Sequence, residues 1–248
     1  MNLFKLDSHM HLDLYANRNT IIDYIEAEKS YTIAVTNLPD LYERVYSCIG
    51  ENTKYIRCAL GFHPELAFQY RHQIIKFSSY LASTRYIGEI GLDFTIRDNN
   101  NRIAQEDIFS HIIYECNKAK EKILTIHSRR AEKEVINILN NLSTCSVIMH
   151  WYSGSLALLN EGLDRGYYYS VNHQMLQSVH GRKIVDSIPN DRILFESDAP
   201  FTNGLSKKYT NNFMKDLYNY LCNSRRLSES DLSIQLYNNF KTLLTNKK

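Results

Sequence analysis

Six side chains that can bind metal ions share a recurring local setting in the chain. Each one follows or ends a short apolar run; they are His9, His11, Glu89, His127, His150 and Asp198. Histidine nitrogens and carboxylate oxygens are the common protein ligands of zinc and related divalent ions. Burying such groups without partners is costly, so we expect them to be paired or to bind metal. The set therefore predicts a metal site that activates water for hydrolysis.

The first two histidines are separated by one residue. In extended backbone, residues i and i+2 point to the same side, so His9 and His11 can reach one ion together. An isolated pair of this kind is weak support for a metal site, and the other four residues strengthen it. The alternative is that some of these histidines are hydrogen-bond partners of ligands and not ligands themselves. Asp93 is expected to orient a ligand imidazole in this way.

The ligand count indicates how many ions the site holds. Four imidazoles and two carboxylates suffice for two divalent ions if one carboxylate bridges them. Imidazole-rich sites suit zinc, manganese, iron or nickel better than magnesium or calcium. We expect two divalent ions, with zinc, manganese and magnesium as candidates. Asp198 is expected both to bind metal and to accept a proton from the attacking water.

Eight short apolar segments position these residues, and amphipathic helical patterns separate them. We predict strands over residues 3–6, 31–36, 55–60, 86–90, 123–126, 146–149, 167–171 and 192–195. Alternating strands and helices in 248 residues favour a TIM-type (β/α)8 barrel, with residues 1–248 as one domain. Catalytic residues of such barrels lie at the carboxyl ends of the strands.

Three further segments complete the predicted architecture. Residues 96–101 and 202–212 are polar and are expected to be long loops after the fourth and eighth strands. Residues 228–248 have helical apolar spacing and are expected to form a final helix that closes the barrel.

Composition narrows the class of protein only modestly. The net charge of +2 neither requires nor excludes a nucleic-acid partner. Five scattered cysteines without a C-x-x-C pair indicate reduced thiols in place of a disulfide framework. Neither a signal peptide nor a membrane-spanning segment is recognisable, so we expect a cytoplasmic protein that does not associate with membranes.

Six short motifs in the same order resemble those of the TatD family of metal-dependent deoxyribonucleases, within the amidohydrolase-like barrels. They are DSHMHLD (7–13), GFHPE (61–65), GEIGLDF (88–94), IHSR (126–129), HWYSG (150–154) and ESDAP (196–200). The resemblance implies hydrolysis of DNA phosphodiester bonds. It also implies that His9, His11 and Asp198 bind one metal ion, that His127 and His150 bind the other and that Glu89 bridges, while His63 faces the substrate phosphate.

The chain departs from the family pattern beside two motifs. Thr95 and Ile96 stand where relatives often carry a histidine or tyrosine, and Trp151 and Tyr152 replace the more common cysteine and phenylalanine. These changes bear on substrate preference. The phrases HLDLY, AVTNLP and HWYSG are also similar to QatD, the TatD-like component of the Qat anti-phage defence system, which implies protein partners in a defence complex.

Residues beside the ligands indicate how a nucleic acid would bind. Trp151 and Tyr152 are placed to stack on unpaired bases, and Arg129 to meet a phosphate, which favours single-stranded DNA or DNA ends. The alternatives are that Trp151 packs beneath its loop and that Arg129 pairs with a nearby glutamate.

Two other functions stay open at this point. Related barrels hydrolyse amides, esters or lactones with the same ligand arrangement, so a small-molecule amidohydrolase is the first alternative. A partner-dependent subunit of a multiprotein defence complex is the second.

Overall fold

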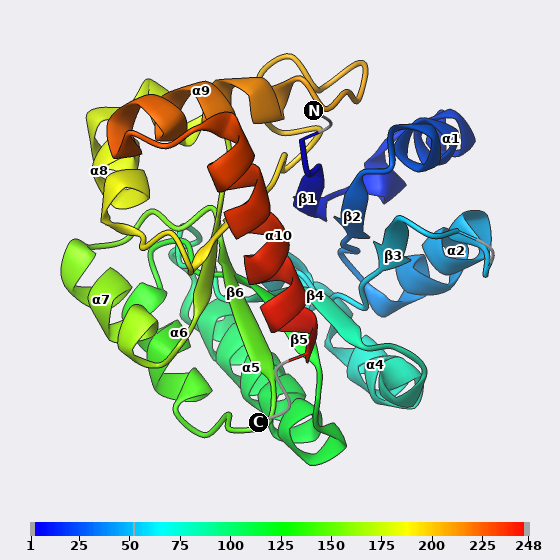
Figure 1. Ribbon diagram of the computed structural model, residues 1–248. Helices are drawn as coiled ribbons and strands as arrows, with labels where there is room; N and C mark the ends of the chain where they lie inside the picture. The colour runs from blue at the N-terminus through cyan, green and yellow to red at the C-terminus, as the bar shows by residue number, and fades with distance from the viewer. Residues whose placement is uncertain (1–2, 52, 246–248) are drawn as a thin grey trace.

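The computed structural model describes residues 3–51 and 53–245 of the 248-residue chain. Eight parallel strands form its centre, and helices surround them (Figure 1). The strands are β1 (Leu6–Met10), β2 (Tyr31–Ala34), β3 (Ile56–Cys58), β4 (Tyr86–Gly91), β5 (Ile123–His127), β6 (Ser146–His150), β7 (Tyr168–Val171) and β8 (Ile193–Phe195).

The helices follow the strands in alternation. They are α1 (Arg18–Glu28), α2 (Pro39–Ile49), α3 (Ala67–Tyr70), α4 (Ile74–Tyr80), α5 (Asn99–Ala119), α6 (Glu132–Leu139), α7 (Leu156–Asp164), α8 (Val179–Ser187), α9 (Phe213–Arg225) and α10 (Glu229–Thr245). Among the described residues, no helix is both long enough and apolar enough to cross a membrane.

Hydrogen bonds at two seams close the strands into a barrel. Strands β1–β3 form one parallel sheet and β4–β8 another. Leu60 bridges to Ile87 at the first seam. At the second seam, the Asp198 amide donates to the His9 carbonyl at 2.9 Å. The predicted (β/α)8 barrel is therefore confirmed.

Helix α10 covers the end of the barrel where the strands begin. Phe240 and Leu243 pack into an apolar cluster with Leu6, Ile123 and other buried strand residues. The Asn239 amide donates to the carbonyls of Asn190 and Ile193, which ties α10 to the start of β8. This agrees with the final helix expected over residues 228–248, of which 246–248 lie outside the described residues. The opposite end of the barrel is left for the site.

The first strand lies further along the chain than predicted. It spans Leu6–Met10, whereas the apolar pattern indicated residues 3–6. The reason is that its buried polar side chains have partners elsewhere in the barrel. Asp7 accepts hydrogen bonds from the Ser197 amide and the Tyr209 hydroxyl, and Ser8 donates to a carbonyl of β8. A strand whose buried polar side chains form such hydrogen bonds does not have an apolar sequence.

The loop predicted over residues 96–101 is also shorter than expected. Helix α5 begins at Asn99, because the Asp98 carboxylate accepts a hydrogen bond from the Asn101 amide at 2.8 Å and caps the helix. Residues 202–212 contain neither helix nor strand, as predicted.

A close backbone approach at Gly61 connects the fold to the site. A Cβ atom at Gly61 would lie 1.6 Å from the Thr36 carbonyl oxygen and 2.7 Å from the Glu89 nitrogen. Strands β2 and β4 therefore approach each other here only because position 61 has no side chain.

We expect Gly61→Ala to destabilise the fold by about 3 kcal/mol or more, because backbone atoms must move to admit the methyl group. The control is Gly166→Ala, where φ is +80° and a Cβ would contact nothing within 4 Å, so only backbone strain of about 1–2 kcal/mol is expected. Urea unfolding measures both. Equal losses in the two variants would contradict this account.

Candidate metal centre

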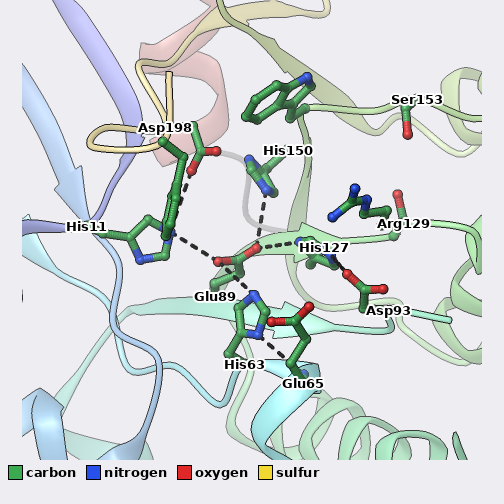
Figure 2. A pocket seen from close by; sticks show the side chains of 13 residues that line it. His11, His63, Glu65, Glu89, Asp93, His127, Arg129, His150, Ser153 and Asp198 are labelled. Atoms are coloured by element: carbon green, nitrogen blue, oxygen red, sulfur yellow. Dashed lines mark hydrogen bonds and ion pairs between the residues drawn. The ribbon is translucent and has the colours of Figure 1, made fainter. Parts of the chain in front are cut away.

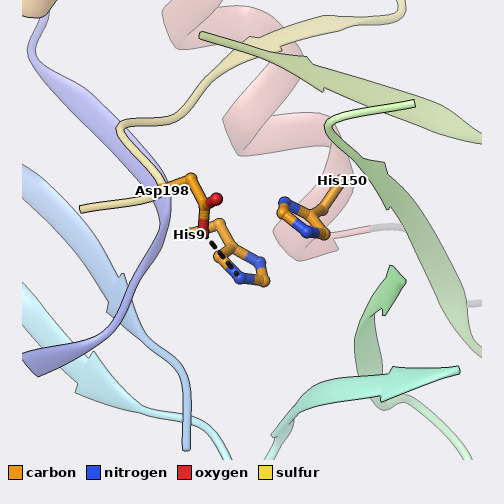
Figure 3. A group of neighbouring side chains, drawn as sticks. All are labelled: His9, His150 and Asp198. Carbon is orange, nitrogen blue, oxygen red and sulfur yellow. Dashed lines mark ion pairs between the residues drawn. The ribbon is translucent and has the colours of Figure 1, made fainter. Parts of the chain in front are cut away.

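The six predicted metal ligands converge at the carboxyl end of the barrel (Figures 2 and 3). Figure 2 shows five of them, and Figure 3 shows His9 beside His150 and Asp198. Five of them are less than 6% exposed, and the His127 side chain is 14% exposed. They come from β1, β4, β5 and β6 and from the segments directly after β1 and β8. Convergence follows from the parallel barrel, since all its strands end at the same rim.

Glu89 lies at the centre of this cluster, and its two oxygens face different imidazoles. Oε1 is 2.6 Å from His127 Nδ1 and 3.2 Å from His150 Nε2. Oε2 is 3.3 Å from His11 Nε2 and 3.5 Å from His9 Nε2. His63 Nε2 lies 3.6 Å from the same Oε2. The carboxylate thus faces histidines with both of its oxygens, which is the arrangement that a bridging ligand requires.

Asp198 completes the side of the cluster that contains His9 and His11. Its Oδ1 lies 3.5 Å from His11 Nε2 and 3.7 Å from His9 Nε2. Figure 3 shows Asp198 and His9 together with His150, whose ring stacks on that of His9 at a centroid distance of 3.8 Å. Asp198 has a φ of +46°, a left-handed conformation that non-glycine residues rarely adopt.

The donor atoms fit a divalent cation. His9 Nδ1 bonds to the Thr125 hydroxyl at 2.8 Å, while its Nε2 is buried without a hydrogen-bond partner among the described residues. Three groups have their ligand atoms within 4.8 Å of one another: His9, His11 and Glu89; His9, His150 and Asp198; and His63, Glu89 and His127. The third group adds His63 as a possible ligand, which was predicted only to face substrate.

Burial and neighbouring charges shift the pKa values of the clustered carboxylates and imidazoles in opposite directions. Burial raises the pKa of Glu89, but the surrounding imidazoles outweigh it and hold that pKa well below its usual value. Burial likewise opposes protonation of His11 and His127, yet their carboxylate neighbours raise the pKa values to about 10 and about 9. The cluster must therefore release protons when it binds a cation. Burial lowers the pKa of His63 to about 4, so that ring is neutral at pH 7.

Two further carboxylates orient the histidines. Asp93 Oδ2 lies 2.9 Å from His127 Nε2, in the position expected from the sequence. Glu196 is buried and contacts His150 Nδ1 at 3.3 Å. It also accepts hydrogen bonds from the Trp151 amide, the Ser170 hydroxyl and the Asn172 amide. The sequence analysis did not single out Glu196, although it stands two residues before Asp198 at the end of β8.

Five of the six predicted ligands, all except His9, line a cavity of about 570 Å³ that opens at the rim. Arg129 and Trp151 line this cavity beside the ligands, and so does His63. Phe201 also lines it, is 61% exposed and meets the His11 ring edge-on at 5.2 Å. Phe201 was not predicted; the available signal was a large aromatic residue directly after the ESDAP motif.

The structure corrects the expectation for Tyr152. Its side chain is 1% exposed and does not line the cavity. The ring packs edge-on against Tyr169, and the hydroxyl donates to the Ser155 carbonyl at 2.8 Å. Tyr152 therefore packs beneath the rim and cannot stack on a substrate base. Trp151 and Tyr152 are adjacent in sequence, but only Trp151, with φ of +36°, lines the cavity.

The fold and the cluster together define a metal-dependent hydrolase of the amidohydrolase-like barrel class. A family model described as TatD related DNase matches residues 6–245, and the chain belongs to this family.

Relatives of similar length agree with this assignment. An uncharacterized metal-dependent hydrolase of Buchnera aphidicola is 27% identical, over 97% of this chain and 96% of that protein. The human protein named deoxyribonuclease TATDN3 is 25% identical, over 79% of this chain and 77% of its own length. The crystal structure of YJJV, a TatD homolog from Escherichia coli, superposes with a TM-score of 0.84 at 22% identity, covering 98% of each chain, and supports the fold.

We expect Glu196→Gln to weaken metal binding about 10- to 100-fold, because the amide no longer offers two acceptor oxygens to the four groups that surround it. Isothermal titration with zinc or manganese measures the affinity. The control is Glu161→Gln, on the exposed surface of α7, which should leave the affinity unchanged. Unaltered binding in the Glu196 variant would show that His150 does not depend on this contact.

Proposed function

We propose that the protein hydrolyses phosphodiester bonds of DNA with two divalent ions. The observation that carries the proposal is the position of Glu89, whose two oxygens face separate sets of imidazoles. Paired ions sharing a bridging ligand are characteristic of enzymes that cleave phosphate esters. The name of the human relative, a deoxyribonuclease, supports the same reaction.

The proposed ion ligands follow from this division. His9, His11 and Asp198 would hold one ion, His127 and His150 the other, with Glu89 shared between them. Zinc, manganese and magnesium are the candidates, and the imidazole content favours the first two. Divalent ions held there make water more acidic and neutralise charge on phosphoryl oxygens.

Two side chains of the chain itself would handle protons and the phosphate. Asp198 lines the cavity and would accept the proton from the attacking water. His63 would donate a hydrogen bond to a phosphoryl oxygen. Its Nδ1 accepts from the Glu65 amide at 3.3 Å, so the proton of the neutral ring lies on Nε2, the atom nearer Glu89.

The rim of the cavity suits a single-stranded nucleic acid. Trp151 is half-buried and Phe201 exposed, so both offer ring surface on which bases can stack. Stacking of this kind contributes about 1–3 kcal/mol per base and tolerates any sequence. Arg129 is exposed beside them and would meet a phosphate. We therefore propose single-stranded DNA or DNA ends as the substrate.

We also propose that the enzyme acts in the cytoplasm with protein partners in a Qat-like anti-phage defence complex. The support is the similarity of three short phrases, HLDLY, AVTNLP and HWYSG, to QatD. The complete ligand set argues against an inactive scaffold. Co-expression with the neighbouring genes should yield a stable complex, and phage plating should show protection that is lost in Asp198→Asn. Protection by the complex carrying the inactive variant would contradict an enzymatic role.

The decisive assay compares the wild type with Asp198→Asn on labelled single- and double-stranded DNA, with manganese, magnesium or zinc. We expect the variant to lose at least about 100-fold in rate, because it lacks both a metal ligand and the proton acceptor. The matched control is Asp191→Asn, an exposed carboxylate that pairs with Arg192.

The opposite result would identify a different enzyme. If the wild type binds two ions, cleaves no nucleic acid and hydrolyses an amide, ester or lactone from a small-molecule panel, the nuclease proposal is wrong. The protein would then be an amidohydrolase.

A further inference from the structure

We propose that a second hollow beside the metal cavity binds the phosphate next along the strand from the bond that is cleaved. The hollow is formed mainly by Arg129 and Arg130 after β5 and by residues 153–155 after β6. This inference rests on the proposed function and sharpens it, since it requires a polynucleotide with at least two consecutive phosphates as substrate.

The hollow is continuous with the metal cavity. Arg129 and Ser153 line both of them. The second hollow has a volume of about 560 Å³, and Arg130, Ser155 and His180 line its far side. A chain that places one phosphate near Glu89 and passes Arg129 would therefore enter this hollow next.

Both arginines are available for an anion. They are exposed, and within residues 3–51 and 53–245 neither forms an ion pair with a carboxylate. Among the arginines in the described part of the chain, only Arg165 and Arg192 form such pairs, with Glu161 and Asp191. A guanidinium binds phosphate oxygens through two parallel hydrogen bonds. Two unpaired guanidinium groups at one hollow therefore favour a phosphate ligand.

The backbone at Arg130 adds an independent observation. Its φ is +56°, a left-handed conformation that is strained for a residue with a side chain. Glycine or asparagine would fit this turn at lower cost. Strain held at a residue that lines a cavity is typical of a binding position.

The opposite wall of the hollow is fixed. His180 Nε2 donates to the carbonyls of Ser153 and Gly154 at 3.0 and 3.1 Å. A Cβ at Gly154 would lie 2.5 Å from the Tyr152 hydroxyl, so this segment packs closely on the residue beneath it. The exposed hydroxyl groups of Ser153 and Ser155 can donate further hydrogen bonds.

The negative charge of Glu132 does not cancel this site. Glu132 lines the hollow and is partly buried. Burial raises the pKa of its carboxyl group. Glu132 lies in the first turn of α6, where the helix dipole favours a negative charge, and the described part of the chain contains no ion pair between it and either arginine.

The test compares Arg130→Gln with wild type on two phosphodiesters. One is a labelled single-stranded oligonucleotide; the other is bis(p-nitrophenyl) phosphate, which has a single phosphate. We expect the variant to lose at least about 10-fold in kcat/KM on the oligonucleotide, mainly through KM, and less than 2-fold on the small diester. The slope of log affinity against log salt should fall by about one unit in magnitude for the oligonucleotide.

Lys133→Gln is the matched control, because it removes one positive charge from an exposed residue nearby that does not line the hollow. It should behave as wild type on both substrates. Equal behaviour of the Arg130 and Lys133 variants on the oligonucleotide would overturn the inference, as would a parallel loss on the small diester.

Failure of the proposed function would look different. In that case wild type would cleave neither phosphodiester. The inference is then decided by fluorescence anisotropy with the same oligonucleotide and protein freed of metal. If Arg130→Gln binds the oligonucleotide more weakly than both wild type and Lys133→Gln, the anion site is supported. Identical binding by the three proteins rejects it.

Discussion

The carboxylate of Glu89 is buried among five imidazoles, and the arrangement of the barrel mouth depends on it. An isolated buried charge is costly, so this carboxylate is tolerated only where compensating groups surround it closely. Those groups come from β1, β5 and β6 and from the segments after β1 and β3, so these strands must end at one level around β4. The close approach at Gly61 and the contacts of Glu196 with His150 preserve the same spacing.

Much of the fold could be predicted from the sequence, because buried parallel strands are short, apolar runs. The prediction was wrong for β1, where Asp7 and Ser8 are buried with partners that lie about 190 residues away in the chain, such as Ser197. It also placed a loop over the first turn of α5, because a polar run with a capping aspartate resembles a loop. In both cases, long-range or local hydrogen bonds satisfy polar groups whose partners the pattern does not reveal.

The cluster of histidines and carboxylates could be predicted because these residue types stand out at the ends of apolar strands. The residues around them could not be assigned with equal success. Glu196 acts through His150, and a carboxylate with such a role looks like any other acidic residue in the sequence. Trp151 and Tyr152 are neighbours of similar chemistry, and only backbone geometry decides that the first lines the cavity and the second packs beneath it.

Helix α10 closes one end of the barrel and the candidate ligands occupy the other. The part of the molecule that stabilises the fold is therefore separate from the part that selects a substrate. The surfaces that meet a substrate belong to segments after β5, β6 and β8, which contribute little to the apolar cluster beneath α10. Evolution can therefore exchange these segments while the ligands and the fold persist. Members of the family can for this reason share the fold and diverge in what they cleave, and a shared set of candidate metal ligands is alone a poor guide to biological role.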